Sequence, residues 1–368
     1  MKKSILFPGQ GSQYVGMGLD VYEAFEEAKE VYQEVDDVLQ INLSDIIFRG
    51  EASDLNLTAN TQPAIMATGV AIFRVLQKKN NLKITDFSFC AGHSLGEYTA
   101  LVCAESLSLA DAAKILRARG QAMQSAVKPG EGSMAAVLGS EIKDIEQLIK
   151  ESNYSTVEIS NDNCPGQIVI SGKKSEVDEC LIGIKQKLSK KSISLPVSAP
   201  FHCQLMKPAA EEIKDLIVNL SMKNPLIPIV SNVTAEAVTQ ADEVKQLLIQ
   251  QIYKRVRWRE IIEYMFKNSN DSFLEIGPGK ALSGMLKRFK KEIPAMPLGD
   301  SLGQKILLSG ENLGKRLNIE NPELYAVFPY RIFGVGKPDL PLALKTFSMR
   351  GYKSWNGWHQ DAIQAALL

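Results

Sequence analysis

A serine between two glycines is the strongest chemical signal in this sequence. Residues 90–100 read CAGHSLGEYTA, which places Ser94 at the centre of a G-x-S-x-G. An apolar stretch, DFSFCA, leads into the motif, and LGEYTALVCA, which favours a helix, leads out of it. A sharp strand-to-helix turn raises a serine hydroxyl above the sheet, and the helix N-terminus adds positive potential there. The pattern predicts that Ser94 is a nucleophile, with an inert serine in a structural turn as the alternative.

A nucleophilic serine needs a base, and the sequence offers three histidines, His93, His202 and His359. His93 adjoins Ser94, and neighbouring side chains diverge on a tight turn, so we expect His93 to support the site or contact substrate. His359 lies in an atypical C-terminal stretch. His202 follows a predicted hinge, where a cleft between domains is expected. It is therefore the best candidate base, and a structural histidine is the alternative.

The composition excludes several classes of function. Lys+Arg and Asp+Glu both number 42, so net charge gives no indication of a nucleic-acid partner. No stretch is long and apolar enough to cross a membrane. The five cysteines form no C-x-x-C pair, which is typical of reduced thiols in a cytoplasmic protein. No His/Cys cluster has metal-site spacing and no dinucleotide or phosphate loop is present, so we expect neither a metal nor a bound cofactor.

Hydrophobic patterning predicts a large α/β domain with a mainly parallel sheet. Because a G-x-S-x-G turn is typical of α/β-hydrolases, we expect this domain to be α/β-hydrolase-like. Strands are expected at SILFPG, DFSFCAGHS, IPIVSNV and SFLEIGPG. Helices are expected at about 20–39, 61–77, 95–104, 109–127, 244–253 and 258–267, with Pro63 in the first turn of the second. This large domain is expected to comprise residues 1–126 and 199–299.

A smaller unit is predicted at 127–198, inserted in the large domain. Its elements follow the order β-α-β-β-α-β, which is that of ferredoxin-like subdomains. Pro129-Gly130 and residues 196–200 flank it as candidate hinges. Residues 300–368 have many turn formers and weak periodicity, and we predict an atypical tail there rather than a complete domain.

Seven motifs together give the sequence a specific resemblance. It resembles the malonyl-CoA:acyl carrier protein transacylases, including the trans-acting acyltransferases of modular polyketide synthases, in motif order and spacing over roughly residues 4–290. The motifs are PGQGSQ, GHSLGEY, RARG, NDNCPGQIVISG, VSAPFHC, QIYKRVRW and EIGPGK.

The resemblance implies a role for each matching residue. Ser94 would take the malonyl group as an ester, and His202 would be its base. Gln251 would orient His202 through its main-chain carbonyl, so that no aspartate is needed. The backbone N–H groups of Gln10 and Leu95 would form the oxyanion hole. Arg119 would pair with the free carboxylate of malonate, because a guanidinium donates two parallel hydrogen bonds; a surface arginine is the alternative.

Further residues are candidates for substrate contacts. The ring of Phe201 would leave little room for an α-methyl group, which favours malonyl over methylmalonyl, although one methyl discriminates only modestly. A core aromatic is the alternative. Asn161 and Asn163 match positions near the acyl-CoA or the mouth of the site in the family, but asparagine is also an ordinary turn former. His93, beside Ser94, is a further candidate for a substrate contact.

We expect a ping-pong reaction in which a CoA thioester acylates Ser94 and the phosphopantetheine thiol of an acyl carrier protein takes the malonyl group. Polyketide synthase modules are further candidate partners. An editing hydrolase of acyl carrier proteins and an inactive carrier-protein scaffold are the alternatives. The basic runs at 254–259 and 287–291 are either docking surface for an acidic carrier or solvated helix faces.

Overall fold

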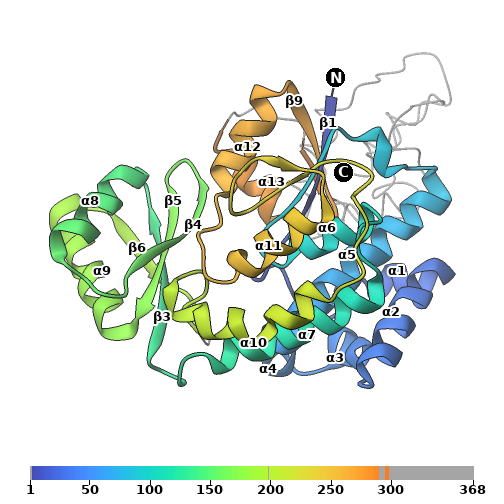
Figure 1. The fold of residues 1–368 in the computed structure, drawn as a ribbon, viewed down its shortest axis with the longest axis horizontal. Coiled ribbons are helices and arrows are strands. Elements are labelled where there is room, and N and C mark those ends of the chain that lie inside the picture. The colour runs from blue at the N-terminus through green and yellow to red at the C-terminus, as the bar shows by residue number, and fades with distance from the viewer. Residues whose placement is uncertain (1, 198, 290–294, 298–368) are drawn as a thin grey trace, which may run out of the picture.

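The structure, a computed structural model, describes residues 2–197, 199–289 and 295–297 and has a larger and a smaller lobe (Figure 1). The predicted tail at 300–368 lies outside the described residues. A six-stranded sheet in the order β10-β9-β1-β2-β7-β8 forms the centre of the larger lobe. Its strands are β1 (Lys2–Phe7), β2 (Phe89–Gly92), β7 (Ile229–Val230), β8 (Ala237–Val238), β9 (Asn270–Glu275) and β10 (Ala295–Pro297). Only β8 runs antiparallel to its neighbour, so the chain has the predicted α/β fold with a mainly parallel sheet.

Helices cover both faces of this sheet. Successive side chains of a strand point to opposite faces, and Ile5 and Phe7 pack into the core with α5 (Thr58–Asn80), α6 (Gly96–Cys103) and α7 (Leu109–Ser125). Leu6, between them, packs on the other face against α12 (Trp258–Lys267) and α13 (Ala281–Leu286). The apolar run of β1 is buried because the sheet lies between these two layers.

The N-terminal helices depart from the prediction in two ways. The helix expected at 20–39 is two helices, α1 (Leu19–Ala24) and α2 (Glu26–Leu39), because Phe25 between them is extended with φ −133°. Helix α5 begins at Thr58, so Pro63 lies inside it and not in its first turn. Proline cannot donate to the carbonyl four residues earlier, and Arg117 Nη1 donates to that oxygen, Ala59 O, instead (3.1 Å).

The smaller lobe is an antiparallel sheet with two helices. Its strand order is β4-β5-β3-β6, with every pair antiparallel. The elements are β3 (Gly132–Leu138), α8 (Ile142–Ser152), β4 (Glu158–Cys164), β5 (Gln167–Lys173), α9 (Lys174–Leu188) and β6 (Lys191–Ser194). A separate core containing Val137, Ile145 and Ile170 fills the space between this sheet and its helices.

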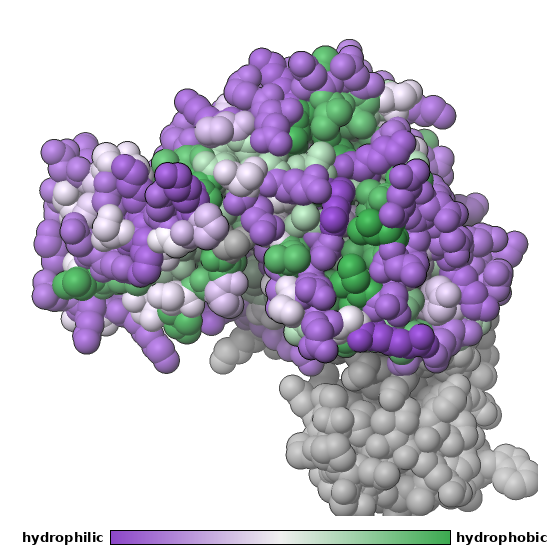
Figure 2. All heavy atoms as spheres, turned by 90° about the horizontal axis from the view of Figure 1, so that it is seen from below, coloured by the Kyte–Doolittle hydropathy of each residue, from purple (hydrophilic) through white to green (hydrophobic). Residues whose placement is uncertain are grey.

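Several elements of the larger lobe were not predicted. They are α3 (Leu43–Arg49), α4 (Ala52–Leu55), α10 (Lys207–Val218), β8, β10 and α13. Helix α11 spans Ala241–Gln251 and begins before the predicted range. Hydrophilic residues cover most of the face shown in Figure 2, with hydrophobic residues in small patches between them. No helix within the described ranges is long and apolar enough to cross a membrane.

Candidate active site

The site lies where neighbouring parallel strands end. Ser94 follows β2, Gln10 follows β1 and Asn232 follows β7, and these three strands are adjacent in the sheet. Carboxyl ends of parallel strands meet at one edge, where α/β folds bind their ligands. Ser94 and Gln10 line a cavity of 330 Å³ there, together with side chains from both lobes.

The turn at Ser94 holds its backbone in an unusual conformation. Its φ is +52°, a left-handed value that non-glycine residues rarely adopt outside turns and strained sites. The flanking glycines permit the tight turn. A Cβ on Gly92 would lie 1.9 Å from the carbonyl of Gly96, and a Cβ on Gly96 would lie 2.4 Å from Phe7 O. The geometry therefore explains both glycines of the G-x-S-x-G.

His202 faces the serine hydroxyl. Its Nε2 lies 2.8 Å from Ser94 Oγ, and its Nδ1 lies 2.8 Å from the main-chain oxygen of Gln251. A carbonyl oxygen only accepts, so Nδ1 carries the proton and Nε2 is free to accept from the serine. Burial, followed by the nearby positive charge of Arg119, lowers the pKa of His202 to about 3. The imidazole is therefore neutral in the substrate-free protein near pH 7.

Arg119 lies in the same cavity and is not a surface residue, since only 1% of it is exposed. Its Nη2 donates to Ser94 Oγ (3.1 Å) and to Gln251 Oε1 (2.8 Å), and its Nη1 donates to Gln62 Oε1 (2.7 Å). Burial lowers the pKa of Arg119. The guanidinium thus has neutral hydrogen-bond partners, and an anion entering the cavity would supply the missing negative charge.

The other predicted site residues line the same cavity. They are Leu95, His93, Asn161, Asn163 and Phe201. His93 Nε2 lies 2.9 Å from Asn163 Oδ1, and its ring stacks at a tilt on Trp258. His93 therefore points toward the smaller lobe and does not contact Ser94 Oγ. Burial also lowers its pKa.

Three buried polar residues of the site were missed from the sequence: Gln62, Glu97 and Asn232. Gln62 contacts Arg119. Asn232 Oδ1 accepts from Ser94 N (2.7 Å) and its Nδ2 donates to Gly92 O (2.7 Å), which fixes the turn. Glu97 accepts from Gln251 Nε2 (2.7 Å). Glu97 lies inside the GHSLGEY motif and is the one charged residue of α6. A charged residue in a helix that is otherwise uncharged could have indicated a buried polar contact.

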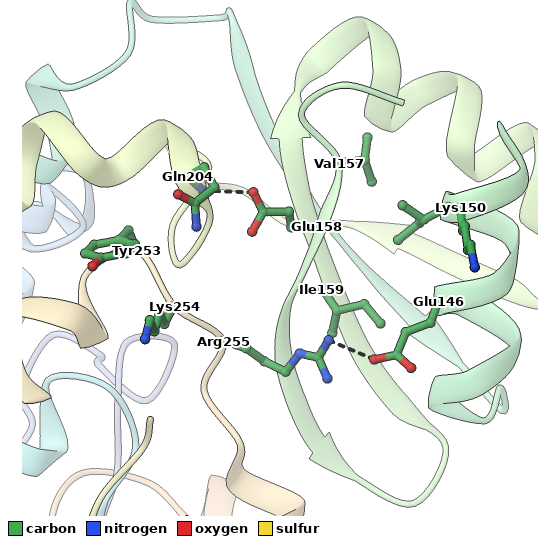
Figure 3. Close-up of a pocket in the computed structure, with 10 residues that line it drawn as sticks. Glu146, Lys150, Val157, Glu158, Ile159, Gln204, Tyr253, Lys254 and Arg255 are labelled. Carbon is green, nitrogen blue, oxygen red and sulfur yellow. Dashed lines mark hydrogen bonds and ion pairs between the residues drawn. The ribbon is translucent and has the colours of Figure 1, made fainter. Parts of the chain in front are cut away.

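A second cavity, also of 330 Å³, lies between the lobes (Figure 3). In it, Arg255 pairs with Glu146 (2.9 Å), and Glu158 accepts from the backbone of Gln204 (3.1 Å). Its lining residues include no serine, threonine, cysteine or histidine, so it does not repeat the serine and histidine pair of the first cavity. Its contacts attach the segments after His202 and after Gln251 to the smaller lobe.

The basic run at 254–259 is occupied by internal contacts. Each arginine of the run is paired with a carboxylate: Arg255 with Glu146, Arg257 with Glu260, and Arg259 with Asp162 and Glu263. These ion pairs favour a solvated, ion-paired surface over a docking surface for a carrier protein. The run at 287–291 lies partly outside the described residues. Within the described ranges, no group of three or more His, Cys, Asp or Glu side chains could hold a metal ion.

Comparison with known proteins places the chain in a family. The pattern of the acyl transferase domain matches residues 5–305. The chain belongs to the acyl transferase domain family. Among its relatives, the malonyl CoA-acyl carrier protein transacylase of Bacillus subtilis is 43% identical over 301 residues, which are 81% of this chain and 94% of the relative.

Solved acyl transferase structures share the fold. The acyl-carrier-protein-S-malonyltransferase from Bartonella henselae has a TM-score of 0.80 at 44% identity, covering 84% of this chain and 99% of that one. A malonyl-transacylase in complex with its type II polyketide synthase acyl-carrier protein has a TM-score of 0.80 at 36% identity, covering 84% and 100%. The family resemblance inferred from the seven motifs is confirmed.

Proposed function

We propose that this acyltransferase moves malonyl from malonyl-CoA to the phosphopantetheine thiol of an acyl carrier protein, for fatty acid or polyketide synthesis. The observation that carries the proposal is the shared contact at Ser94. Its Oγ lies 2.8 Å from the neutral imidazole of His202 and 3.1 Å from the guanidinium of Arg119. These contacts support roles for Ser94 as the nucleophile, for His202 as its base and for Arg119 as the receptor of the second carboxylate of a diacid. The names of the relatives support the same substrates.

In the acylation half-reaction, Ser94 Oγ attacks the thioester carbonyl while His202 Nε2 takes the hydroxyl proton. The tetrahedral oxyanion would accept from the backbone N–H groups of Gln10 and Leu95. Collapse breaks the C–S bond, and the CoA thiolate leaves with the proton from His202. The main-chain oxygen of Gln251 stabilises the transient imidazolium from Nδ1.

Transfer to the carrier repeats these steps with a thiol as nucleophile. His202 takes the phosphopantetheine proton, the sulfur attacks the Ser94 ester, and the proton returns to Ser94 Oγ as the C–O bond breaks. Arg119 would hold the malonyl carboxylate throughout. Phe201, His93, Asn161 and Asn163 would contact the acyl group or the pantetheine arm, since all four line the cavity.

The proposal needs no metal or bound redox cofactor, because serine and histidine supply the nucleophile and the base. We further propose an α/β-hydrolase-like large domain (1–126 and 199–299) and a ferredoxin-like subdomain (127–198). The strand order β4-β5-β3-β6 with α8 and α9 supports the latter. A cytoplasmic location is proposed from the five buried, reduced thiols.

The deciding experiment is intact-mass analysis after mixing the protein with malonyl-CoA, methylmalonyl-CoA and acetyl-CoA. A malonyl adduct on the wild type that is absent from Ser94→Ala, and that passes to a carrier protein, is expected. An adduct chiefly from acetyl-CoA would contradict the role of Arg119. Release of free malonate in place of malonyl carrier protein would favour the hydrolase. Adducts from no CoA ester, with the protein folded, would favour the scaffold.

A further inference from the structure

The side-chain amide of Gln251 lies at the centre of the site and contacts three of its groups. Its Oε1 accepts from Arg119 Nη2 (2.8 Å), and its Nε2 donates to the main-chain oxygen of Ser94 (2.9 Å). Nε2 also donates to Glu97 Oε2 (2.7 Å). The amide thus touches both the turn that carries the nucleophile and the guanidinium proposed to bind substrate.

Glu97 is a buried carboxyl group without a direct ion pair among the described residues. It lies in the first turn of α6, with 2% of its surface exposed. Besides Gln251 Nε2, the backbone N–H of Asn232 donates to its Oε2 at 3.4 Å. The proposed mechanism assigns it no step, although burying a carboxyl group is costly unless its hydrogen bonds are satisfied.

The acceptors and donors around Gln251 permit only one orientation of its amide. Two acceptors, Glu97 Oε2 and Ser94 O, face the NH2 group, and a donor, Arg119 Nη2, faces the oxygen. A flipped amide would direct its oxygen at two acceptors and its N–H groups at a cation. Glu97 supplies one of these two acceptors, and its Oε2 is the nearer of them to Gln251 Nε2 (2.7 Å against 2.9 Å).

We propose that Glu97 is a positioning residue that acts through Gln251: it holds the amide in the orientation that places the guanidinium of Arg119 beside Ser94 Oγ. The inference rests on the proposed function, in which Arg119 binds the malonyl carboxylate. Without Glu97, the amide keeps one acceptor, Ser94 O, and the guanidinium loses a fixed partner. Selection of malonyl over acetyl would then weaken, while Ser94 and His202 would keep their contact.

The hydrogen-bonding role requires an acceptor at position 97 rather than a full charge. Burial raises the pKa of Glu97 to about 7, although the hydrogen bond from Gln251 opposes the shift. A neutral carboxylic acid still accepts through its carbonyl oxygen. Glutamine, which has the same shape and an acceptor oxygen, should therefore replace Glu97, whereas methionine has the same length and no comparable acceptor.

The test compares Glu97→Gln with Glu97→Met by the rates at which malonyl-CoA and acetyl-CoA acylate Ser94. Glu97→Gln should keep the wild-type malonyl-to-acetyl ratio within about threefold, and Glu97→Met should lower it about tenfold, the effect of losing one hydrogen bond of about 1.4 kcal/mol. The fall should come from the malonyl rate, with the acetyl rate nearly unchanged. A general loss of packing would slow both substrates.

A double-mutant cycle tests whether Glu97 acts through the amide. Gln251→Leu removes the amide but keeps the main-chain oxygen that contacts His202, and it should lower the ratio as Glu97→Met does. Adding Glu97→Met to Gln251→Leu should then have no further effect. If Glu97→Met does not fold, Gln251→Leu alone still tests whether the amide supports selection of malonyl over acetyl.

Two results would overturn the inference. The first is a folded Glu97→Met or Gln251→Leu protein with the wild-type ratio, and the second is an additive double mutant. Both leave the proposed function intact, because the wild type would still select malonyl. A wild type that does not select malonyl would instead overturn the proposed function, and this inference with it.

Discussion

Arg119 is buried, and its hydrogen-bond partners are neutral. Burying a guanidinium costs free energy, and an anion bound beside it would offset that cost. Replacing it by methionine should therefore affect malonyl and acetyl substrates differently. We expect Arg119→Met to lower the malonyl-to-acetyl ratio of Ser94 acylation at least about 100-fold, since each charge-assisted hydrogen bond contributes about 1.5–3 kcal/mol. Arg119→Lys keeps the charge without the planar fork and should be intermediate. An unchanged ratio in Arg119→Met would contradict the assignment.

The lowered pKa of His202 predicts how the stability of the protein depends on pH. The pKa of His202 is lowered to about 3 in the folded protein, against about 6.5 in an unfolded chain. Between these values the unfolded state binds more protons, so acidification below pH 6.5 removes stability. The pKa of Glu97 is raised from 4.5 to about 7, so between these pH values the folded state binds more protons and acidification increases stability.

A His202→Gln variant isolates the histidine contribution, because both proteins keep Glu97. From pH 7.5 to pH 5 the wild type should lose about 2 kcal/mol more of its free energy of unfolding than the variant, from about 1.4 kcal/mol per unit of pKa difference. Urea denaturation at the two pH values measures this. Equal losses in both proteins would show that the pKa of His202 is not lowered.

Among the elements, the strand-to-helix turn should be the least tolerant of substitution. Gly92→Ala would place a methyl group 1.9 Å from a backbone carbonyl, which no side-chain rotation relieves. We expect a loss at or above the upper end of the roughly 1–3 kcal/mol typical of overpacked core positions, or no folded protein, because the clash is with backbone atoms. Gly284→Ala in α13 is the control, since nothing lies within 4 Å of its Cβ. That change should be neutral or stabilise by up to about 1 kcal/mol in urea denaturation.

At the scale of the whole molecule, β4 of the smaller lobe is joined to the larger lobe beside the site. Asp162 N donates to Val256 O (2.9 Å), and the buried Asp162 carboxylate accepts twice from Arg259 Nε and pairs with its Nη2 (2.8 Å). Asp162 lies between Asn161 and Asn163, which line the same cavity as Ser94. These contacts therefore help to position Asn161 and Asn163 of the smaller lobe at the cavity.

Asp162→Ala should lower the free energy of unfolding by about 1–3 kcal/mol, because Nε and Nη2 of the partly exposed Arg259 lose their charge-assisted hydrogen bonds to a buried carboxylate. The rate of Ser94 acylation should fall as well. Asp178→Ala is the matched control: its pair with Lys174 is exposed and should contribute at most about 1 kcal/mol. Equal effects of the two substitutions on urea denaturation would contradict a structural role for the contacts of Asp162.

Short-range patterns in the sequence correctly predict several local features of the fold. Helix α12 occupies the predicted range 258–267, and the strand, turn and helix around Ser94 follow the predicted order. Periodicity and glycine spacing determine such features because they depend on residues a few positions apart. The seven motifs also determined the family, because their order and spacing are specific where a lone G-x-S-x-G is not.

Which polar groups contact one another depends on how distant elements pack, and could not be predicted from the sequence. Asn232 supports the turn at Ser94 from 138 residues away, and the Gln251 amide joins Ser94, Glu97 and Arg119 across two helices. Pairings at such separations depend on how the sheet, α6, α7 and α11 pack. Hydrophobic periodicity records that a side chain is buried, but it does not record which partner it contacts there. For this reason the candidate nucleophile Ser94 could be predicted from the sequence, while the hydrogen bonds that hold its turn could not.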